Sequence, residues 1–270
     1  MPELPEVETT RKGIKPYTHQ QTVAKVVVRQ PKLRWPVPTD IAQMEGQLIE
    51  SVRRRGKYIL LETSAGTAII HLGMSGSLRI VDDGLAPEKH DHVDFIMDTG
   101  KTVRLHDPRR FGAVLWTQQN PLKHKLIRSL GPEPLSDDFN ADYLYEVSRG
   151  RSMSIKQFIM NGHVVVGVGN IYACESLFMS GISPKWQAGK VSKARYQKLV
   201  EQIKIVLTKA IAQGGTTLKD FVQVEGKPGY FKQELNAYGR AGERCNNCES
   251  TIKQITQGQR STFYCGKCQR

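Results

Sequence analysis

The stretch HVDFIMDTGKTVRL, residues 92–105, contains the pattern that decides the fold. Apolar and polar side chains alternate on both sides of the turn sequence Asp98-Thr99-Gly100, as they do in strands that are buried on one face. The same alternation recurs at 23–29, 58–62, 67–71 and 113–116. Short strands at this spacing predict a β-sandwich or barrel, and the three prolines in residues 31–38 predict a loop.

The pattern becomes helical after residues 131–134, a Gly-Pro-Glu-Pro sequence that we interpret as a domain boundary. Ser136 or Asp137 is expected to cap a helix that reaches Arg149, and residues 154–160 predict a shorter helix.

Two further helices are predicted in the second half of the chain. Asn170 is expected to cap a helix over residues 171–180, which Gly181 ends. Ser192 can cap the next helix, which has one apolar face and ends at the glycine pair 214–215.

Four of the five cysteines form two CxxC pairs separated by 16 residues, namely Cys245, Cys248, Cys265 and Cys268. This is the spacing of a four-cysteine zinc ribbon, and residues 251–255 and 260–264 predict the hairpin between the pairs. Four thiolates leave no open coordination position, so we expect one structural Zn2+ per chain and no catalytic metal. Cys174 is expected to be a reduced, buried small residue.

The composition points to an acidic partner. The chain has 270 residues, enough for two or three domains, and a formal net charge of +13. Such a charge predicts binding to an acidic polymer or a membrane surface, and we favour nucleic acid. The sequence has no apolar run of 18 residues and no signal segment, so we expect a soluble, cytoplasmic protein without membrane contact.

Basic residues are spread over both halves of the chain, which predicts a groove lined with phosphate contacts. A solvated surface is the alternative for each of them. The set is Arg53, Arg54, Arg55, Lys57, His90, Arg109, Arg110, Arg149, Arg151, Lys156 and Arg260. The glycines at 167–169, at a helix start, add backbone N–H groups that can hold a phosphate.

The first eight residues, MPELPEVE, include a candidate nucleophile. Removal of Met1, expected before a small second residue, exposes the secondary amine of Pro2. An α-amino group titrates near roughly 7.7 to 8.0, against about 10.4 for lysine, so part of it is unprotonated near neutral pH. Its attack on a sugar carbon would give an iminium ion without an N–H proton to lose. Glu3 is close enough to transfer the proton that sugar chemistry requires.

Pro5, Glu6 and Glu8 are expected in the first turn of a helix that continues to about Ile14. This helix would hold the catalytic end in place. The alternative is that proline and glutamate here mark an ordinary solvated helix start.

Two loop sequences, residues 71–77 and 107–112, each follow a strand and place a large apolar side chain between turn-forming residues. Met74 and Phe111 can act as wedges between stacked bases. The alternative is that both side chains fill the protein core.

Several motifs together resemble those of bacterial formamidopyrimidine-DNA glycosylases. They are MPELPEVE, HLGMSGSLR, HDHVD, DPRRFG, LGPEPLSDDF, VGVGNIYA-x-ES, GGTTLKDF, GKPGYF and the terminal zinc ribbon. The resemblance covers the whole chain. Relatives of the endonuclease VIII type begin with a different octet and lack the DPRRFG loop, which favours the purine-lesion branch.

The resemblance implies an α+β fold with three domains. A two-sheet β-sandwich with an N-terminal helix would form residues 1–131. A helical domain with a helix-two-turns-helix motif and a lesion-binding loop, residues 217–238, would form residues 132–235. A zinc finger would form residues 236–270.

The resemblance also implies a base-excision-repair enzyme that acts, as a monomer associated with the nucleoid, on duplex DNA with an oxidised purine or an abasic site. Pro2 would attack the anomeric carbon and Glu3 would transfer the proton on the ring oxygen. Lys57 would donate the proton for β-elimination and Arg260 for δ-elimination, leaving a one-nucleotide gap. A guanidinium that stays charged is a poor acid, so for Arg260 we favour orientation of the leaving phosphate.

Because the damaged base lies inside the duplex, it must be flipped out, at a cost of a few kcal/mol. By resemblance, the residues that fill the void are Met74, Arg109 and Phe111, with Arg109 facing the orphaned cytosine. The other DNA contacts implied are Lys57, His71, His90, Arg151, Asn170 and Arg260. Glu6 and Glu175 are implied in the substrate pocket.

The chain departs from the family pattern at Cys174, where serine is usual, and at His106, where threonine or asparagine is expected. Two other classes of protein stay open. A zinc-ribbon DNA-binding protein would not need a free Pro2. A tautomerase with an N-terminal proline would need neither zinc nor the charge of +13.

Overall fold

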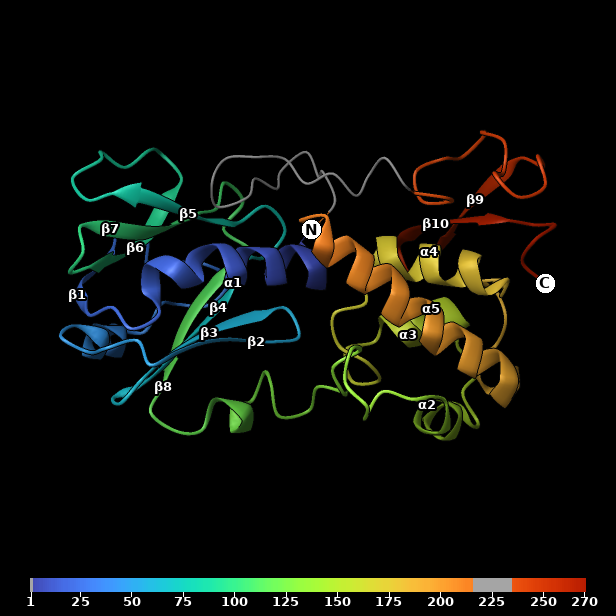
Figure 1. The fold of residues 1–270 in the computed structure, drawn as a ribbon, viewed down its shortest axis with the longest axis horizontal. Helices are drawn as coiled ribbons and strands as arrows, with labels where there is room; N and C mark the ends of the chain where they lie inside the picture. The colour runs from blue at the N-terminus through green and yellow to red at the C-terminus, as the bar shows by residue number, and fades with distance from the viewer. Residues whose placement is uncertain (1, 216–234) are drawn as a thin grey trace. The chain divides into compact units, whose positions relative to one another are not determined.

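The computed structural model describes residues 2–215 and 235–270. These residues divide into two compact units, one of residues 2–129 with 213–215 and the other of residues 130–212 with 235–270 (Figure 1). Residues 217–234 of the predicted lesion-binding loop lie outside the described residues.

The first unit, as far as it is described, contains two antiparallel four-stranded sheets (Figure 1). One sheet has the order β1-β6-β7-β5, with bounds Val23–Val28 for β1, Asp91–Met97 for β6, Lys101–His106 for β7 and Ser77–Asp82 for β5. The other has the order β2-β3-β4-β8, with bounds Ser51–Arg55, Tyr58–Thr63, Gly66–His71 and Ala113–Thr117. The predicted sandwich is confirmed.

One apolar core joins the two sheets. Phe95 pairs with Val103 across β6 and β7, and both are fully buried. They share a cluster with Ile59 and Ile70 of the other sheet. The alternation along residues 92–105 therefore places one face of each strand in the core. Strands β2 and β5 were not predicted; in β2 only Val52 is buried, so almost no alternation marks it.

Helix α1 (Leu4–Thr18) packs on the sandwich and buries Leu4, Val7 and Ile14. The sequence predicted that this helix ends near Ile14, but it continues past Pro16 to Thr18. Proline lacks one main-chain N–H, but the last turn also contains the buried Thr18, whose hydroxyl donates to the carbonyl oxygen of Ile14. The stabilisation gained by burying this turn exceeds the cost of the main-chain hydrogen bond that Pro16 cannot form.

The described part of the second unit contains helices and a hairpin. Their bounds are Ala141–Ser148 for α2, Ile155–Met160 for α3, Asn170–Ser180 for α4, Lys193–Ala212 for α5, Ile252–Gln257 for β9 and Arg260–Cys265 for β10. Short 3-10 helices lie at Thr39–Met44 (η1) and Pro121–Lys123 (η2) of the first unit and at Ala188–Lys190 (η3) of the second. Helix α5 packs on α4 and α2 and buries Leu199, Ile203 and Leu207 of the predicted apolar face.

Two predicted helix caps are wrong. Asn140, rather than Ser136 or Asp137, caps α2, and its side chain accepts from the main-chain N–H of Tyr143 at 2.9 Å. Gly169 is the N-cap of α4, and Asn170 is its first residue. Gly181 ends α4 as predicted, with a left-handed φ of 69°. Ser154, which the sequence placed inside a helix over residues 154–160, is the N-cap of α3.

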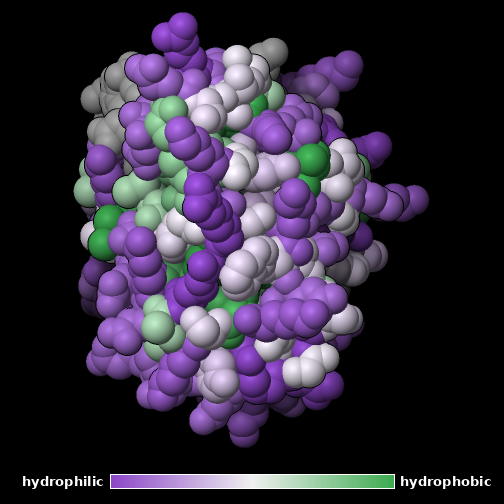
Figure 2. All heavy atoms as spheres, turned by 90° about the vertical axis from the view of Figure 1, so that its right-hand side faces the viewer, coloured by the Kyte–Doolittle hydropathy of each residue, from purple (hydrophilic) through white to green (hydrophobic). Residues whose placement is uncertain are grey.

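On the face drawn in Figure 2, hydrophilic side chains cover most of the surface and hydrophobic ones are scattered between them. Among the described helices, none has the length and apolar character needed to cross a membrane.

Candidate active site and nucleic-acid interface

The N-terminal segment is buried and fixed to the start of α1. Pro2 is buried, and Glu3 and Glu6 are 4% and 0% exposed. A capping box links the two acids, and the main-chain N–H of Glu3 donates to Oε2 of Glu6 at 2.8 Å. The alternative of a solvated helix start is therefore wrong. Both carboxyl groups lie at the start of α1.

Lys57 and His71 lie close together in one sheet, with His71 at the end of β4. Lys57 is in the turn between β2 and β3, and the next residue, Tyr58, pairs with His71 with their rings 5.0 Å apart. Burial, with the positive charges of Lys57 and Arg34, lowers the pKa of His71 to about 4. The imidazole is therefore neutral at neutral pH.

The tautomer of His71 follows from its hydrogen bond. The main-chain N–H of Gly73 donates to Nδ1 at 3.0 Å, which assigns the proton to Nε2. His71 can thus offer a phosphate one neutral N–H donor, not a positive charge.

The two predicted DNA-facing loops are packed against each other. A side-chain carbon at Gly73, where φ is +67°, would lie 2.3 Å from the backbone carbonyl carbon of Phe111. The fully buried Asp107 accepts hydrogen bonds from the Gly112 N–H at 2.7 Å and the Ser75 hydroxyl at 3.2 Å. One carboxylate therefore joins residues 71–77 to residues 107–112, a role that the sequence analysis missed.

Phe111 is 45% exposed, and the guanidinium of Arg109 lies 5.1 Å from the centre of its ring. The alternative that Phe111 fills the core is therefore wrong. Met74, next to Gly73, is half-buried. The loops thus present an aromatic ring and a cation at one place on the surface, a combination suited to stacked bases.

His90 lies at the base of the same loop. Its carbonyl oxygen accepts from the main-chain N–H of Asp107 at 2.9 Å, and its ring is 5.9 Å from that of His106. Nδ1 of His106 in turn lies 2.8 Å from Oδ1 of Asp91. Asp91 also forms ion pairs with two guanidinium groups, those of Arg79 and Arg104. Although Glu88, Asp91 and His106 are close enough to bind a cation, arginines already supply the positive charge there.

In the second unit, the hairpin residue next to Arg260 is held from α3 and α4. Lys156, 1% exposed, donates from Nζ to the carbonyl oxygen of Ser261 at 2.9 Å and to Oγ1 of Thr262 at 2.7 Å. Nδ2 of Asn170 donates to the same Ser261 oxygen at 3.0 Å. The structure thus brings Asn170 to the start of β10, and Arg260 itself is exposed.

The predicted phosphate contact is wrong for Lys156, and Arg149 is exposed but has partners within the second unit. Lys156 is buried beneath the hairpin. The guanidinium of Arg149 lies 3.9 Å from the ring centre of Tyr145 and donates to carbonyl oxygens of residues 145, 188, 189 and 191. Both side chains have a structural role. Arg151 is exposed, as a DNA contact requires.

Glu175 is only 2% exposed, and its carboxylate accepts hydrogen bonds from three consecutive main-chain N–H groups. The donors are Asn236 at 2.8 Å, Ala237 at 2.9 Å and Tyr238 at 2.8 Å. Glu175 therefore fixes the segment at 236–238 to α4. Its place in a substrate pocket stays a prediction, as does that of Glu6.

The sulfur atoms of the four paired cysteines lie close together. All four sulfurs lie within 4.8 Å of one another, with Sγ separations of 3.8 Å for Cys245–Cys268 and 3.5 Å for Cys248–Cys265. Four sulfurs at about 2.3 Å from Zn2+ would be about 3.8 Å apart, so the donors fit this ion. Strands β9 and β10 form the predicted hairpin between the pairs. Cys174 is buried in the adjoining apolar cluster.

Three family models match the chain. The formamidopyrimidine-DNA glycosylase N-terminal domain matches residues 1–114, the formamidopyrimidine-DNA glycosylase H2TH domain residues 130–222, and the zinc finger found in FPG and IleRS residues 242–270. The last match and the four sulfurs identify a structural zinc site.

Full-length relatives and solved structures agree with these matches. Formamidopyrimidine-DNA glycosylases of Stutzerimonas stutzeri (strain A1501) and Pseudomonas aeruginosa (strain LESB58) are 57% and 58% identical, each with 100% of both chains covered. The crystal structure of MutM (Fpg) from Thermus thermophilus has a TM-score of 0.90 at 34% identity, covering 99% of this chain and 98% of that one. Lactococcus lactis Fpg in complex with DNA containing an abasic site has a TM-score of 0.91 at 30% identity, with 100% of both chains covered.

Proposed function

The chain belongs to the formamidopyrimidine-DNA glycosylase family, and on this premise we propose that it is a bifunctional glycosylase and abasic-site lyase of base excision repair. Its substrates are 8-oxoguanine and formamidopyrimidines in duplex DNA, and abasic sites. The observation that carries the proposal is the buried Pro2-Glu3 segment, held by the capping box at the start of α1.

The reaction begins with the amine of Pro2, free once Met1 is removed. The amine attacks the anomeric carbon of the damaged nucleotide, and the bond from this carbon to the base breaks. Glu3 transfers the proton to the sugar ring oxygen, so that the ring opens and an iminium ion forms. The position of Glu3 supports this role, because the capping box fixes it at the start of α1, directly after Pro2.

Strand cleavage follows from the positive charge of the iminium, which acidifies the neighbouring sugar carbon. Loss of a proton from this carbon expels the 3′ phosphate by β-elimination, with Lys57 as proton donor. A second, δ-elimination expels the 5′ phosphate. Arg260, which is exposed at the start of β10, orients this leaving phosphate. The two eliminations together leave a one-nucleotide gap in the DNA.

DNA binding distorts the duplex around the extruded base. Phe111 and Met74 occupy the void, and Arg109 faces the unpaired base. The exposure of Phe111 and the packing of Gly73 against its backbone support this assignment. His71, His90, Arg151 and Asn170 contact the DNA. We further propose that the protein acts as a monomer with domains at 1–131, 132–235 and 236–270.

The test is reductive trapping. The protein is incubated with a duplex that contains one 8-oxoguanine opposite cytosine, borohydride is added, and the adduct is mapped by peptide mass spectrometry. We expect the adduct on Pro2. Tight binding without an adduct would favour the zinc-ribbon DNA-binding alternative, and an adduct on a lysine would keep the lyase but exclude Pro2 as nucleophile.

A further inference from the structure

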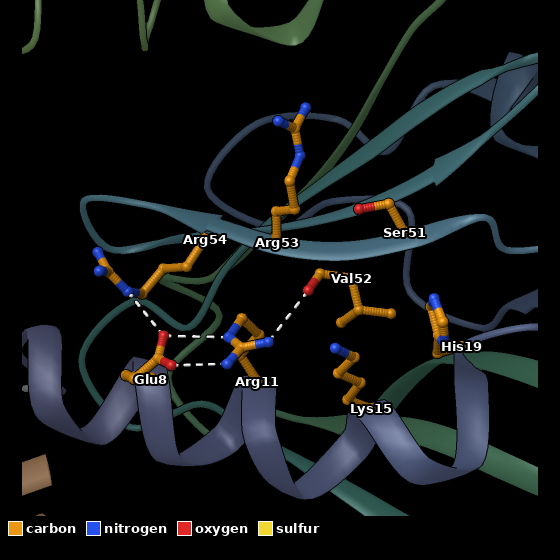
Figure 3. Close-up of a pocket in the computed structure, with 8 residues that line it drawn as sticks. All are labelled: Glu8, Arg11, Lys15, His19, Ser51, Val52, Arg53 and Arg54. Atoms are coloured by element: carbon orange, nitrogen blue, oxygen red, sulfur yellow. Dashed lines mark hydrogen bonds and ion pairs between the residues drawn. The ribbon is translucent and has the colours of Figure 1, made fainter.

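A partly buried ion pair connects the helix that carries Pro2 and Glu3 to the turn that carries Lys57. In the hollow between α1 and β2, the carboxylate of Glu8 meets two guanidinium groups (Figure 3). Oε2 of Glu8 accepts from Nε of Arg54 at 3.0 Å and from Nε of Arg11 at 3.1 Å. Oε1 accepts from Nη2 of Arg11 at 2.7 Å.

Arg54 continues this connection to the turn between β2 and β3. Its Nη1 donates to the carbonyl oxygen of Gly56 at 2.8 Å. Gly56 has a φ of +57°, and Lys57 is the next residue. One guanidinium therefore bonds at one end to α1, five residues beyond Glu3, and at the other end to the turn that carries Lys57.

Low solvent exposure and the charge on Glu8 keep the ion pair between Glu8 and Arg54 formed at neutral pH. The side chains of Glu8 and Arg54 are 14% and 12% exposed. Burial acts to raise the pKa of Glu8, but the hydrogen bonds and charges of Arg11 and Arg54 outweigh it, and the pKa lies below its ordinary value. The carboxylate therefore stays charged at neutral pH. By contrast Arg53, the adjacent residue on β2, is 56% exposed and pairs with Glu62.

We propose that Glu8 and Arg54 are positioning residues that fix Lys57 relative to the nucleophilic start of α1. This proposal rests on the proposed function. Formation of the iminium uses Pro2 and Glu3, which the capping box holds independently of Arg54. β-Elimination also requires Lys57 at a defined distance from the sugar. Loss of the pair should therefore slow elimination more than iminium formation.

The experiment measures both steps on one duplex with a pre-formed abasic site, under single-turnover conditions. Borohydride trapping gives the rate of iminium formation, and gel analysis of the DNA gives the rate of strand cleavage. The variants are Arg54→Gln, Glu8→Gln and Arg54→Lys. The control is Lys101→Gln, which removes one positive charge from an exposed ion pair with Asp82 in the same unit but leaves the bond to Glu8 intact.

We expect Arg54→Gln and Glu8→Gln to slow cleavage by about 10- to 100-fold, the range that small misplacements of a catalytic group produce, while trapping changes by less than about 3-fold. Arg54→Lys keeps the charge beside Glu8 but cannot donate to two acceptors in the same geometry, so its rate should lie between those of Arg54→Gln and wild type. Combining the two glutamine substitutions should add little to either alone, because the pair acts as one unit.

Two outcomes would overturn the positioning role. One is an equal effect of Arg54→Gln and Lys101→Gln on cleavage, and the other is a parallel fall of trapping and cleavage. If Arg54→Gln does not fold, as judged by its urea unfolding curve, Glu8→Gln and Arg54→Lys decide by the same criteria. A wild-type protein that gives no adduct on Pro2 would instead contradict the proposed function.

Discussion

At the scale of single residues, the loops at 71–77 and 107–112 contain side chains that hold the two loops together and side chains that face solvent. Asp107 holds the loops together, because it is fully buried and its carboxylate accepts hydrogen bonds from both loops. We propose Phe111 as a DNA contact, and the same packing leaves its ring 45% exposed. The exposed ring lies beside the guanidinium of Arg109, so a stacked base could reach both groups.

We expect Phe111→Ala to lower the rate of 8-oxoguanine excision by about 10-fold or more, equivalent to about 1.4 kcal/mol, because the wedge that supports base extrusion is lost. Cleavage of a pre-formed abasic site should change little, since no base has to be extruded. Both rates are measured under single-turnover conditions. Leu85→Ala, at another exposed apolar side chain of the first unit, is the control. Equal losses on the two substrates would argue against the wedge.

His71 should make the protein less stable in acid. Its pKa is about 4 in the folded protein, against a usual value of 6.5. Between these values the unfolded chain binds a proton at this residue and the folded protein does not, so stability is lost as the pH falls through this window. Urea unfolding at about pH 7 and about pH 4.5 should show a loss on the order of 1 to 3 kcal/mol larger for wild type than for His71→Gln.

The control for this comparison is His163→Gln, at an exposed histidine of the second unit. It should lose as much stability as wild type. If His71→Gln also does so, the lowered pKa of His71 is not a source of acid sensitivity.

At the scale of elements, helix ends and turns fix the candidate site residues within each of the two units. The start of α1 holds Pro2 and Glu3, and the turn between β2 and β3 holds Lys57. The start of β10, with Arg260, is bonded from α3 and α4 through Ser261. The helix α4 also fixes residues 236–238 through the carboxylate of Glu175.

Glu175→Gln should lower the free energy of unfolding by about 1 to 3 kcal/mol, because the amide places an N–H group where the carboxylate accepted a main-chain hydrogen bond. Urea unfolding followed by circular dichroism measures the change. The matched control, Glu201→Gln, alters an exposed glutamate on α5 and should be neutral within about 0.5 kcal/mol. An equally small effect at Glu175 would contradict this role of its carboxylate.

At the scale of the whole molecule, each compact unit has its own source of stability. The first has an apolar core between two sheets. In the second, the helices bury residues such as Leu199 and Ile203. The cluster beside the four cysteines is small, so the metal has to supply part of the folding energy of the hairpin.

Removal of zinc should therefore unfold the hairpin formed by β9 and β10 and abolish DNA binding, because Arg260 loses its support. Binding to a fluorescent abasic duplex, measured before and after chelation, tests this expectation. The metal content is assayed in parallel, and added Zn2+ should restore binding. Full binding by protein shown to be free of zinc would exclude this dependence.

Much of the fold could be predicted from the sequence, because it depends on neighbours within a few residues. The alternation in residues 92–105 predicted β6 and β7, and the left-handed Gly181 ended α4 as expected. The CxxC spacing predicted the zinc site, and the octet at 1–8 predicted the start of α1. These signals are periods, caps and ligand spacings, and all are local.

The tertiary structure alone decided which charged residues have partners inside the protein. Arg54 meets Glu8 across 46 positions of sequence, and Lys156 meets Thr262 across 106. In the sequence these cations look like the exposed Arg151 and Arg260. The physical reason is that local pattern determines which face of an element is apolar, but a charged side chain is paired or solvated only by contacts that form when distant segments pack together.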